Sequence, residues 1–179
     1  MKSHGELTAK VGKGLKFDGC DVFYDHGTAG ENVGKIVSSI EKKYGKKDGL
    51  SQLDIAVVER SSNRVLVLVE VEESTDRPKT MIGDIFGVLF GEYLSFKRRE
   101  LIVGPFTTLL VTGVGAADYV DRNQHILQKV HKVKALLGTK NSAMDLLPIK
   151  VFPSGAKLLA ELPGEIGRIV QAAPRSAAA

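Results

Sequence analysis

The longest apolar stretch of the chain lies near its middle and is divided by a short polar segment. Positions 53–58 and 65–71 hold mainly apolar residues, most of them β-branched, and the segment 60–64 between them is polar. Short runs of this kind around a polar turn predict a hairpin of two buried strands. Because residues 65–69 are apolar at both odd and even positions, we expect a sheet that is covered on both faces.

Helical periodicity is found on both sides of this hairpin. Apolar residues three and four positions apart predict helices over about 31–44, 79–98, 119–137 and 154–170, the last broken near Pro163. Two further strands are expected over 107–112 and 146–152. This alternation predicts an α/β fold with a mixed central β-sheet flanked by helices.

The chain is expected to form one domain. With 179 residues, of which 43% are hydrophobic, it can build a single core. Residues 1–20 are rich in lysine and glycine and predict an irregular basic arm or a short strand, either a frayed terminus or a segment that touches phosphates. Residues 21–171 then form the domain, and 172–179 are expected to be a disordered tail.

Composition narrows the classes of function. The lone Cys20 excludes an internal disulfide, and the four histidines have no zinc-site spacing. A net charge of +4 is mild and is compatible with a nucleic-acid partner. The absence of a signal peptide and of an apolar run near 18 residues predicts a soluble, cytoplasmic protein without a membrane partner.

Three carboxylates interrupt the buried strands of the hairpin. Asp54 lies in the first run, and Glu70 and Glu72 end the second on one face, roughly 7 Å apart. Buried carboxylates are costly unless a cation or hydrogen bonds offset their charge. Carboxylate oxygens favour Mg²⁺ or Mn²⁺, and crowded acids raise one another's pKa. Alternatively, these carboxylates have only structural roles: Asp54 ends a strand and Glu72 begins a solvent-exposed turn.

Glu31 has two interpretations. Thr28 and Glu31 have the spacing of a capping box, in which Glu31 stabilises the start of the helix expected over 31–44. Alternatively, Glu31 is a fourth acidic metal ligand on a helix that covers the sheet. The sequence leaves both open.

Basic residues gather at the ends of the first two predicted helices. They are Lys42, Lys43, Arg77, Lys79, Lys97, Arg98 and Arg99. Such residues either lie in solvent and interact favourably with a helix dipole, or contact the phosphates of a nucleic acid.

Three glycines recur on one face of the helix predicted over 79–98. Gly83, Gly87 and Gly91 are four residues apart, and each costs helix stability relative to alanine. Their presence predicts a close backbone approach, either to the sheet of the same chain or to a second subunit in a homodimer.

The acidic residues and the element order together resemble the PD-(D/E)xK nuclease superfamily over about residues 27–112. In this resemblance Asp54 is the motif aspartate and Glu70 the acidic member, and Glu72 stands where the family usually has lysine. A minority of the family's restriction endonucleases carry Glu-x-Glu. Leu53 replaces the frequent proline, and Lys79 is a candidate for the missing positive charge.

The resemblance implies a restriction-endonuclease-like core and metal-dependent hydrolysis of DNA phosphodiesters, on duplex or branched substrates. Asp54 and Glu70 would hold Mg²⁺ or Mn²⁺, and Glu72 would bind the metal or act as a base toward water. Two alternatives remain. The chain could be an inactive nuclease-fold module that binds nucleic acid, or an oligomeric scaffold that dimerises through the glycine face.

Overall fold

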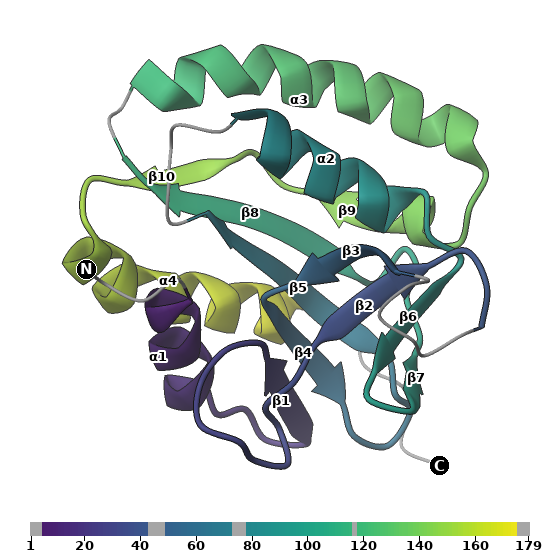
Figure 1. The fold of residues 1–179 in the computed structure, drawn as a ribbon, viewed down its shortest axis with the longest axis vertical. Coiled ribbons are helices and arrows are strands. Elements are labelled where there is room, and N and C mark those ends of the chain that lie inside the picture. The colour runs from purple at the N-terminus through teal and green to yellow at the C-terminus, as the bar shows by residue number, and fades with distance from the viewer. Residues whose placement is uncertain (1–4, 43–48, 73–77, 116–117, 175–179) are drawn as a thin grey trace.

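A mixed β-sheet forms the centre of the computed structural model, which describes residues 5–42, 49–72, 78–115 and 118–174 (Figure 1). Its strands, in spatial order, are β1 (Cys20–Tyr24), β4 (Ile55–Glu59), β5 (Val65–Glu72), β8 (Thr108–Val114) and β10 (Lys150–Phe152). The short β9 (Asp145–Leu146) also pairs with β8. Strands β1, β4 and β5 are antiparallel neighbours, whereas β8 runs parallel to β5 and to β10. The predicted mixed α/β sheet is therefore confirmed.

The predicted central hairpin is confirmed as β4 and β5. Ile55 pairs with Val69 and Val57 with Val67, and every residue of β4 is buried. Two hydrophobic clusters lie on the two faces of the sheet, one containing Ala56 and Leu68 and the other Val57. The apolar character of both faces follows from this double coverage.

Four helices cover the central sheet (Figure 1). They are α1 (Glu6–Gly14) and α4 (Gly155–Ala172) on one face, and α2 (Pro78–Leu89) and α3 (Asp118–Leu137) on the other. The helices predicted over 119–137 and 154–170 are confirmed, but α4 continues through Pro163 without the expected break. Within the described residues, no helix combines the length and apolar character needed to cross a membrane.

A second, antiparallel sheet was not predicted. It contains β3 (Gly49–Leu53), β2 (Ile36–Ser39), β6 (Tyr93–Phe96) and β7 (Arg99–Leu101), in that order. Part of this sheet was expected to be helical because short apolar runs fit more than one period.

The helix expected over 31–44 is wrong where the structure describes that segment. An irregular loop leads into β2, in which Ile36 is fully buried and pairs with Leu53 on one side and Phe96 on the other. Pairing on both edges of β2 outweighs the local helical pattern. The Thr28 and Glu31 capping box therefore does not form, and Glu31 lies exposed in the loop.

The helix expected over 79–98 is correct only for its first part, because α2 ends at Leu89. Gly91 is buried beyond the helix, where an added Cβ would lie 2.0 Å from Ser38 Oγ. The following residues form the hairpin of β6 and β7, and Lys97 in its turn has a φ of 55°. Tertiary pairing with β2 accounts for the change from helix to strand.

The predicted close backbone approach of α2 is found within the chain. A Cβ on Gly87 would lie 2.8 Å from the carbonyl oxygen of Leu50 in β3, whereas Gly83 faces open space. The homodimer through this face stays a prediction.

The two ends of the domain also differ from expectation. The segment predicted to be an irregular arm contains α1, because Thr8, Val11 and Gly12 form a buried face. The strand expected over 146–152 is interrupted at Pro148 and forms the separate strands β9 and β10. Helix α4 extends to Ala172, and the remainder of the predicted tail beyond residue 174 lies outside the described residues.

Candidate functional site

Four carboxylates from three parts of the fold lie near one another at one end of β5. Asp54 occupies the single residue between β3 and β4, and Glu70 and Glu72 belong to the end of β5. The fourth, Asp84, lies on α2. Asp54, Asp84 and Glu72 each raise the pKa of Glu70 by charge repulsion, which places all four in one electrostatic cluster.

Asp54 is held in place by the backbone of its neighbours. Its Oδ2 accepts a hydrogen bond of 2.7 Å from the backbone N–H of Val71, and its carbonyl oxygen accepts one of 2.8 Å from Asp25. These bonds hold the Asp54 carboxylate beside the end of β5. A backbone hydrogen bond from Asp54 also reaches the Glu70 carboxyl, so the two residues are neighbours.

Glu70 is the most unusual member of the cluster. Its Oε2 is shielded from solvent and has no hydrogen-bond partner among the described residues. Burial raises the pKa of Glu70 well above its usual 4.5, and Asp54, Asp84 and Glu72 raise it further. A hydrogen bond from the backbone of Asp54 opposes this rise only in part. The Glu70 carboxylate therefore favours a proton or a cation.

Asp84 was not predicted as part of the site. Burial raises the pKa of its carboxyl, and the hydroxyl of Ser51 opposes this with a 3.4 Å hydrogen bond to Oδ1. Ser51 lies in β3, so this contact joins α2 to the strand that leads into Asp54. In the sequence, Asp84 is one charged residue in an apolar helix, and no spacing relates it to Asp54 or Glu70.

Glu31 does not join the acidic cluster. It is exposed in the loop that precedes β2, and its carbonyl oxygen accepts a 2.7 Å hydrogen bond from Lys97 Nζ. Among the described residues, it is absent from the groups that shift the pKa of Glu70. The structure therefore places Glu31 apart from Asp54, Glu70 and Glu72.

The carboxylates of this cluster are not gathered around a single point. Within the described residues, no three His, Cys, Asp or Glu side chains are arranged to hold one metal ion together. Mg²⁺ commonly binds proteins through one or two carboxylates and keeps several waters. Asp54 and Glu70 are enough carboxylates for that mode of binding.

The predicted basic residues lie elsewhere or are already paired. Lys42 forms a 2.6 Å ion pair with Glu100, and Arg99 donates to Asp21 at 2.9 Å. Lys97 and Arg98 are exposed at the turn between β6 and β7. Lys43 and Arg77, and the side chain of Lys79, lie outside the described residues.

The β6–β7 hairpin lies toward the other end of β4 from the acidic cluster. Arg99 contacts Asp21, which pairs with Val58 in β4, whereas Asp54 directly precedes that strand. Four residues of extended strand correspond to about 13 Å. The basic hairpin is therefore separate from the acidic cluster.

Comparison of the chain with family models, with curated proteins and with solved structures found no match.

Proposed function

We propose that the protein is a metal-dependent nuclease of the PD-(D/E)xK type that hydrolyses DNA phosphodiester bonds. The observation that carries the proposal is the buried Oε2 of Glu70, which has no hydrogen-bond partner among the described residues, beside three further carboxylates that raise the pKa of Glu70. A carboxylate in such surroundings needs a proton or a cation. A cation bound between Asp54 and Glu70 would offset this unfavourable charge.

The order of the elements supports the same proposal. Helix α1, the β4–β5 hairpin, α2 and β8 follow one another along the chain in that order, with β1, β2 and β3 before the hairpin and β6 and β7 before β8. Helix, hairpin, helix and strand is the order on which the resemblance rests. Its first helix was expected over 31–44, where the structure has a loop and β2, and α1 precedes the range 27–112, so α1 matches only the order of the elements.

The residues of the cluster have distinct roles in this proposal. Asp54 and Glu70 hold Mg²⁺ or Mn²⁺, which supplies activation of a water molecule and stabilisation of charge on the phosphate. Glu72 follows Glu70 by two residues on the same face of β5, where it can orient that water or accept its proton. Asp54 keeps its position through the backbone of Val71.

A cleavage assay tests this function. Plasmid, branched and single-stranded DNA are incubated with Mg²⁺ or Mn²⁺, and with EDTA as the metal-free control. We expect metal-dependent cleavage that falls by at least about 100-fold in Asp54→Asn and in Glu70→Gln, because removing a ligand or its charge removes the metal's contribution. Glu161→Gln, an exposed charge change on α4, is the matched control and keeps wild-type activity.

Two results would contradict the proposal. If cleavage persists in both Asp54→Asn and Glu70→Gln, the activity comes from other residues or from a contaminant. Intact DNA under every condition, with DNA still retained in a gel shift, would support the inactive binding module instead.

A further inference from the structure

Strand β1 lies between α1 and the β6–β7 hairpin (Figure 1). Three cavities of about 490, 350 and 490 Å³ adjoin one another there, because each shares lining residues with the other two. Asn32 lines all three, and Asp21 and Arg60 line the two nearest the hairpin. We call these three cavities together the β1 groove.

The β1 groove contains the excess positive charge of the protein. Seven lysines and arginines line it, against the three carboxylates of Glu6, Asp21 and Glu31. The excess of four equals the formal net charge of +4 of the whole chain. The remaining charges of the sequence therefore balance, and an anionic partner is attracted to the groove.

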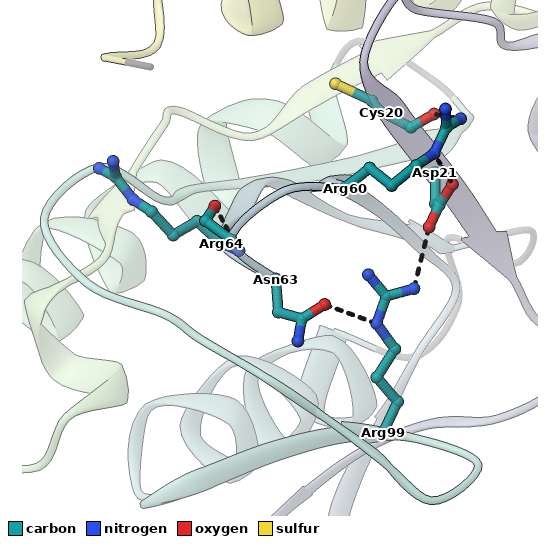
Figure 2. A network of polar contacts seen from close by, with 7 residues as sticks. Cys20, Asp21, Arg60, Asn63, Arg64 and Arg99 are labelled. Carbon is teal, nitrogen blue, oxygen red and sulfur yellow. Dashed lines mark hydrogen bonds and ion pairs between the residues drawn. The ribbon is translucent and has the colours of Figure 1, made fainter. Parts of the chain in front are cut away.

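Two arginines of the groove are fixed by one carboxylate. Figure 2 shows Arg60 and Arg99 reaching Asp21 from two sides, with Arg60 Nε 2.9 Å from Oδ1 and Arg99 Nη1 2.9 Å from Oδ2. Arg60 also donates to the carbonyl oxygen of Cys20, and Arg99 to the Asn63 side chain. A guanidinium has five N–H donors, so each arginine keeps donors for a ligand. The pair is preorganised for a phosphate.

Other cations of the groove carry no counter-charge. Lys13 and Lys16 near the end of α1 and Arg98 at the hairpin are exposed, and none has an ion pair or side-chain hydrogen bond among the described residues. These unpaired cations are spread over all three cavities, which suits a long polyanion better than a single small anion.

The position of the groove relates it to the acidic cluster. Tyr24, which lines the groove, pairs with Ile55, the residue directly after Asp54. The side chains of Asp54, Glu70, Glu72 and Asp84 do not line the groove, so the groove and the acidic cluster are neighbouring surfaces rather than one cavity.

We propose that the β1 groove binds the phosphodiester backbone of the substrate nucleic acid. The identification of that nucleic acid as a substrate rests on the proposed nuclease function, because the groove and the acidic cluster are separate surfaces joined by the β1–β4 pair. Among the contact residues, Lys13 and Lys16 belong to the lysine-rich segment for which the sequence left phosphate contact open, and Arg60 was not indicated by the sequence.

Binding without metal tests the groove separately from catalysis. Fluorescence anisotropy with a labelled duplex in EDTA measures affinity over a series of salt concentrations. For Lys13→Ala/Lys16→Ala we expect about 10-fold weaker binding at low salt and a slope of log affinity against log salt that is shallower by about 2. Lys129→Ala/Lys132→Ala removes two exposed lysines of α3 and keeps wild-type affinity to within about two-fold.

Arg98→Ala tests the hairpin end of the groove with the same probe. We expect a further loss of affinity that adds to that of the lysine variant, because the two ends contact different phosphates. The wild type should bind longer duplexes more tightly than shorter ones, and the combined variant should gain little affinity from the added length. Matched DNA and RNA probes show which backbone is preferred.

The outcomes separate the groove from the nuclease. If Lys13→Ala/Lys16→Ala binds the duplex with wild-type affinity and the wild-type salt slope, the proposal that the groove binds nucleic acid is contradicted, whatever the cleavage assay shows. If binding depends on the groove lysines and persists in Glu70→Gln, but the wild type cleaves no DNA, the groove is supported as a binding site and the nuclease proposal is contradicted. Binding to anionic lipid vesicles alone, with none to DNA or RNA, would also overturn the inference.

Discussion

At the residue scale, the molecule departs most from ordinary protein chemistry at Glu70. Its carboxylate lies at the end of a strand whose first five residues are fully buried, and one oxygen has no hydrogen-bond partner among the described residues. Three neighbouring acids increase the cost of its charge. Such a group lowers the stability of the folded chain whenever it is ionised without a partner, which is the cost expected of a prepared cation site.

The first prediction concerns Glu70→Gln and the pH dependence of stability. Because folding raises the pKa of Glu70, the folded state binds more protons than the unfolded state above the usual value of 4.5. Wild-type stability therefore falls as pH rises through the raised pKa of Glu70. In metal-free buffer at neutral pH, we expect Glu70→Gln to be more stable by about 1–3 kcal/mol.

Thermal unfolding across pH measures this effect. The advantage of Glu70→Gln should appear as a Tm higher by a few degrees at neutral pH and should vanish below about pH 4.5. If the Tm of Glu70→Gln at neutral pH is equal to or lower than that of the wild type, the charge of the Glu70 carboxylate is already offset in the folded protein.

Sequence reasoning found Asp54 and Glu70 for a physical reason. Charge within a β-branched run is rare because buried charge is costly, so these residues stand out from their neighbours. Asp84 does not stand out in this way, because an acid in a helix usually faces solvent. Arg60 was overlooked because it lies in a turn, where charge is ordinary. Only the paired strands bring it next to Asp21.

At the scale of elements, the contact between α2 and β3 holds the two sheets together. The backbone of α2 approaches β3 at Gly87, and Ser51 of β3 bonds to Asp84 of α2. Phe23 of β1 and Phe96 of β6 stack with ring centroids 4.1 Å apart, which joins the sheets at a second place. The second sheet therefore positions both the acidic cluster and the basic hairpin.

A matched pair of glycine substitutions tests the α2 contact. Gly87→Ala would place Cβ 2.8 Å from both the Leu50 carbonyl oxygen and Ser51 Cβ, so we expect a loss of about 1–3 kcal/mol in the free energy of unfolding. Gly83→Ala meets open space, and we expect a gain of about 0.5–1 kcal/mol from helix propensity.

Urea denaturation measures both variants under the same conditions. Equal effects of the two substitutions would contradict the close approach at Gly87. Size-exclusion chromatography of Gly83→Ala tests the predicted homodimer, because Gly83 is the glycine of the three that is open to a second subunit.

Elements were predicted well where the sequence carried its own periodicity over a long segment. The β4–β5 hairpin, β8 and α3 are examples. The second sheet was missed because β2 and β6 are only four residues long and are stabilised by pairing with each other. A four-residue strand pattern such as that around Ile36 also fits one turn of a helix, so only the tertiary partners decide it.

At the scale of the whole molecule, acidic and basic side chains gather at different places. The acidic cluster lies where β4 begins and β5 ends, and the basic β1 groove lies beside β1, the strand that pairs with β4. Phosphate contacts position a nucleic acid, and a metal held by carboxylates acts on one bond of it. The separation of the two charges suits an enzyme that holds a long substrate and cleaves it at one end of the contact.

The measurement that tests the central claim most directly is calorimetric titration of Mg²⁺ into the protein, between about pH 5 and 8, in buffers of different ionisation enthalpy. The raised pKa of Glu70 predicts that Mg²⁺ binding releases protons from the wild type, up to about one at the pH where Glu70 is mostly protonated. Glu70→Gln should lose both this proton release and most of the affinity, while Glu161→Gln should keep both. Absence of Mg²⁺ binding, or binding without proton release that Glu70→Gln leaves unchanged, would contradict the assignment of the acidic cluster as a metal site.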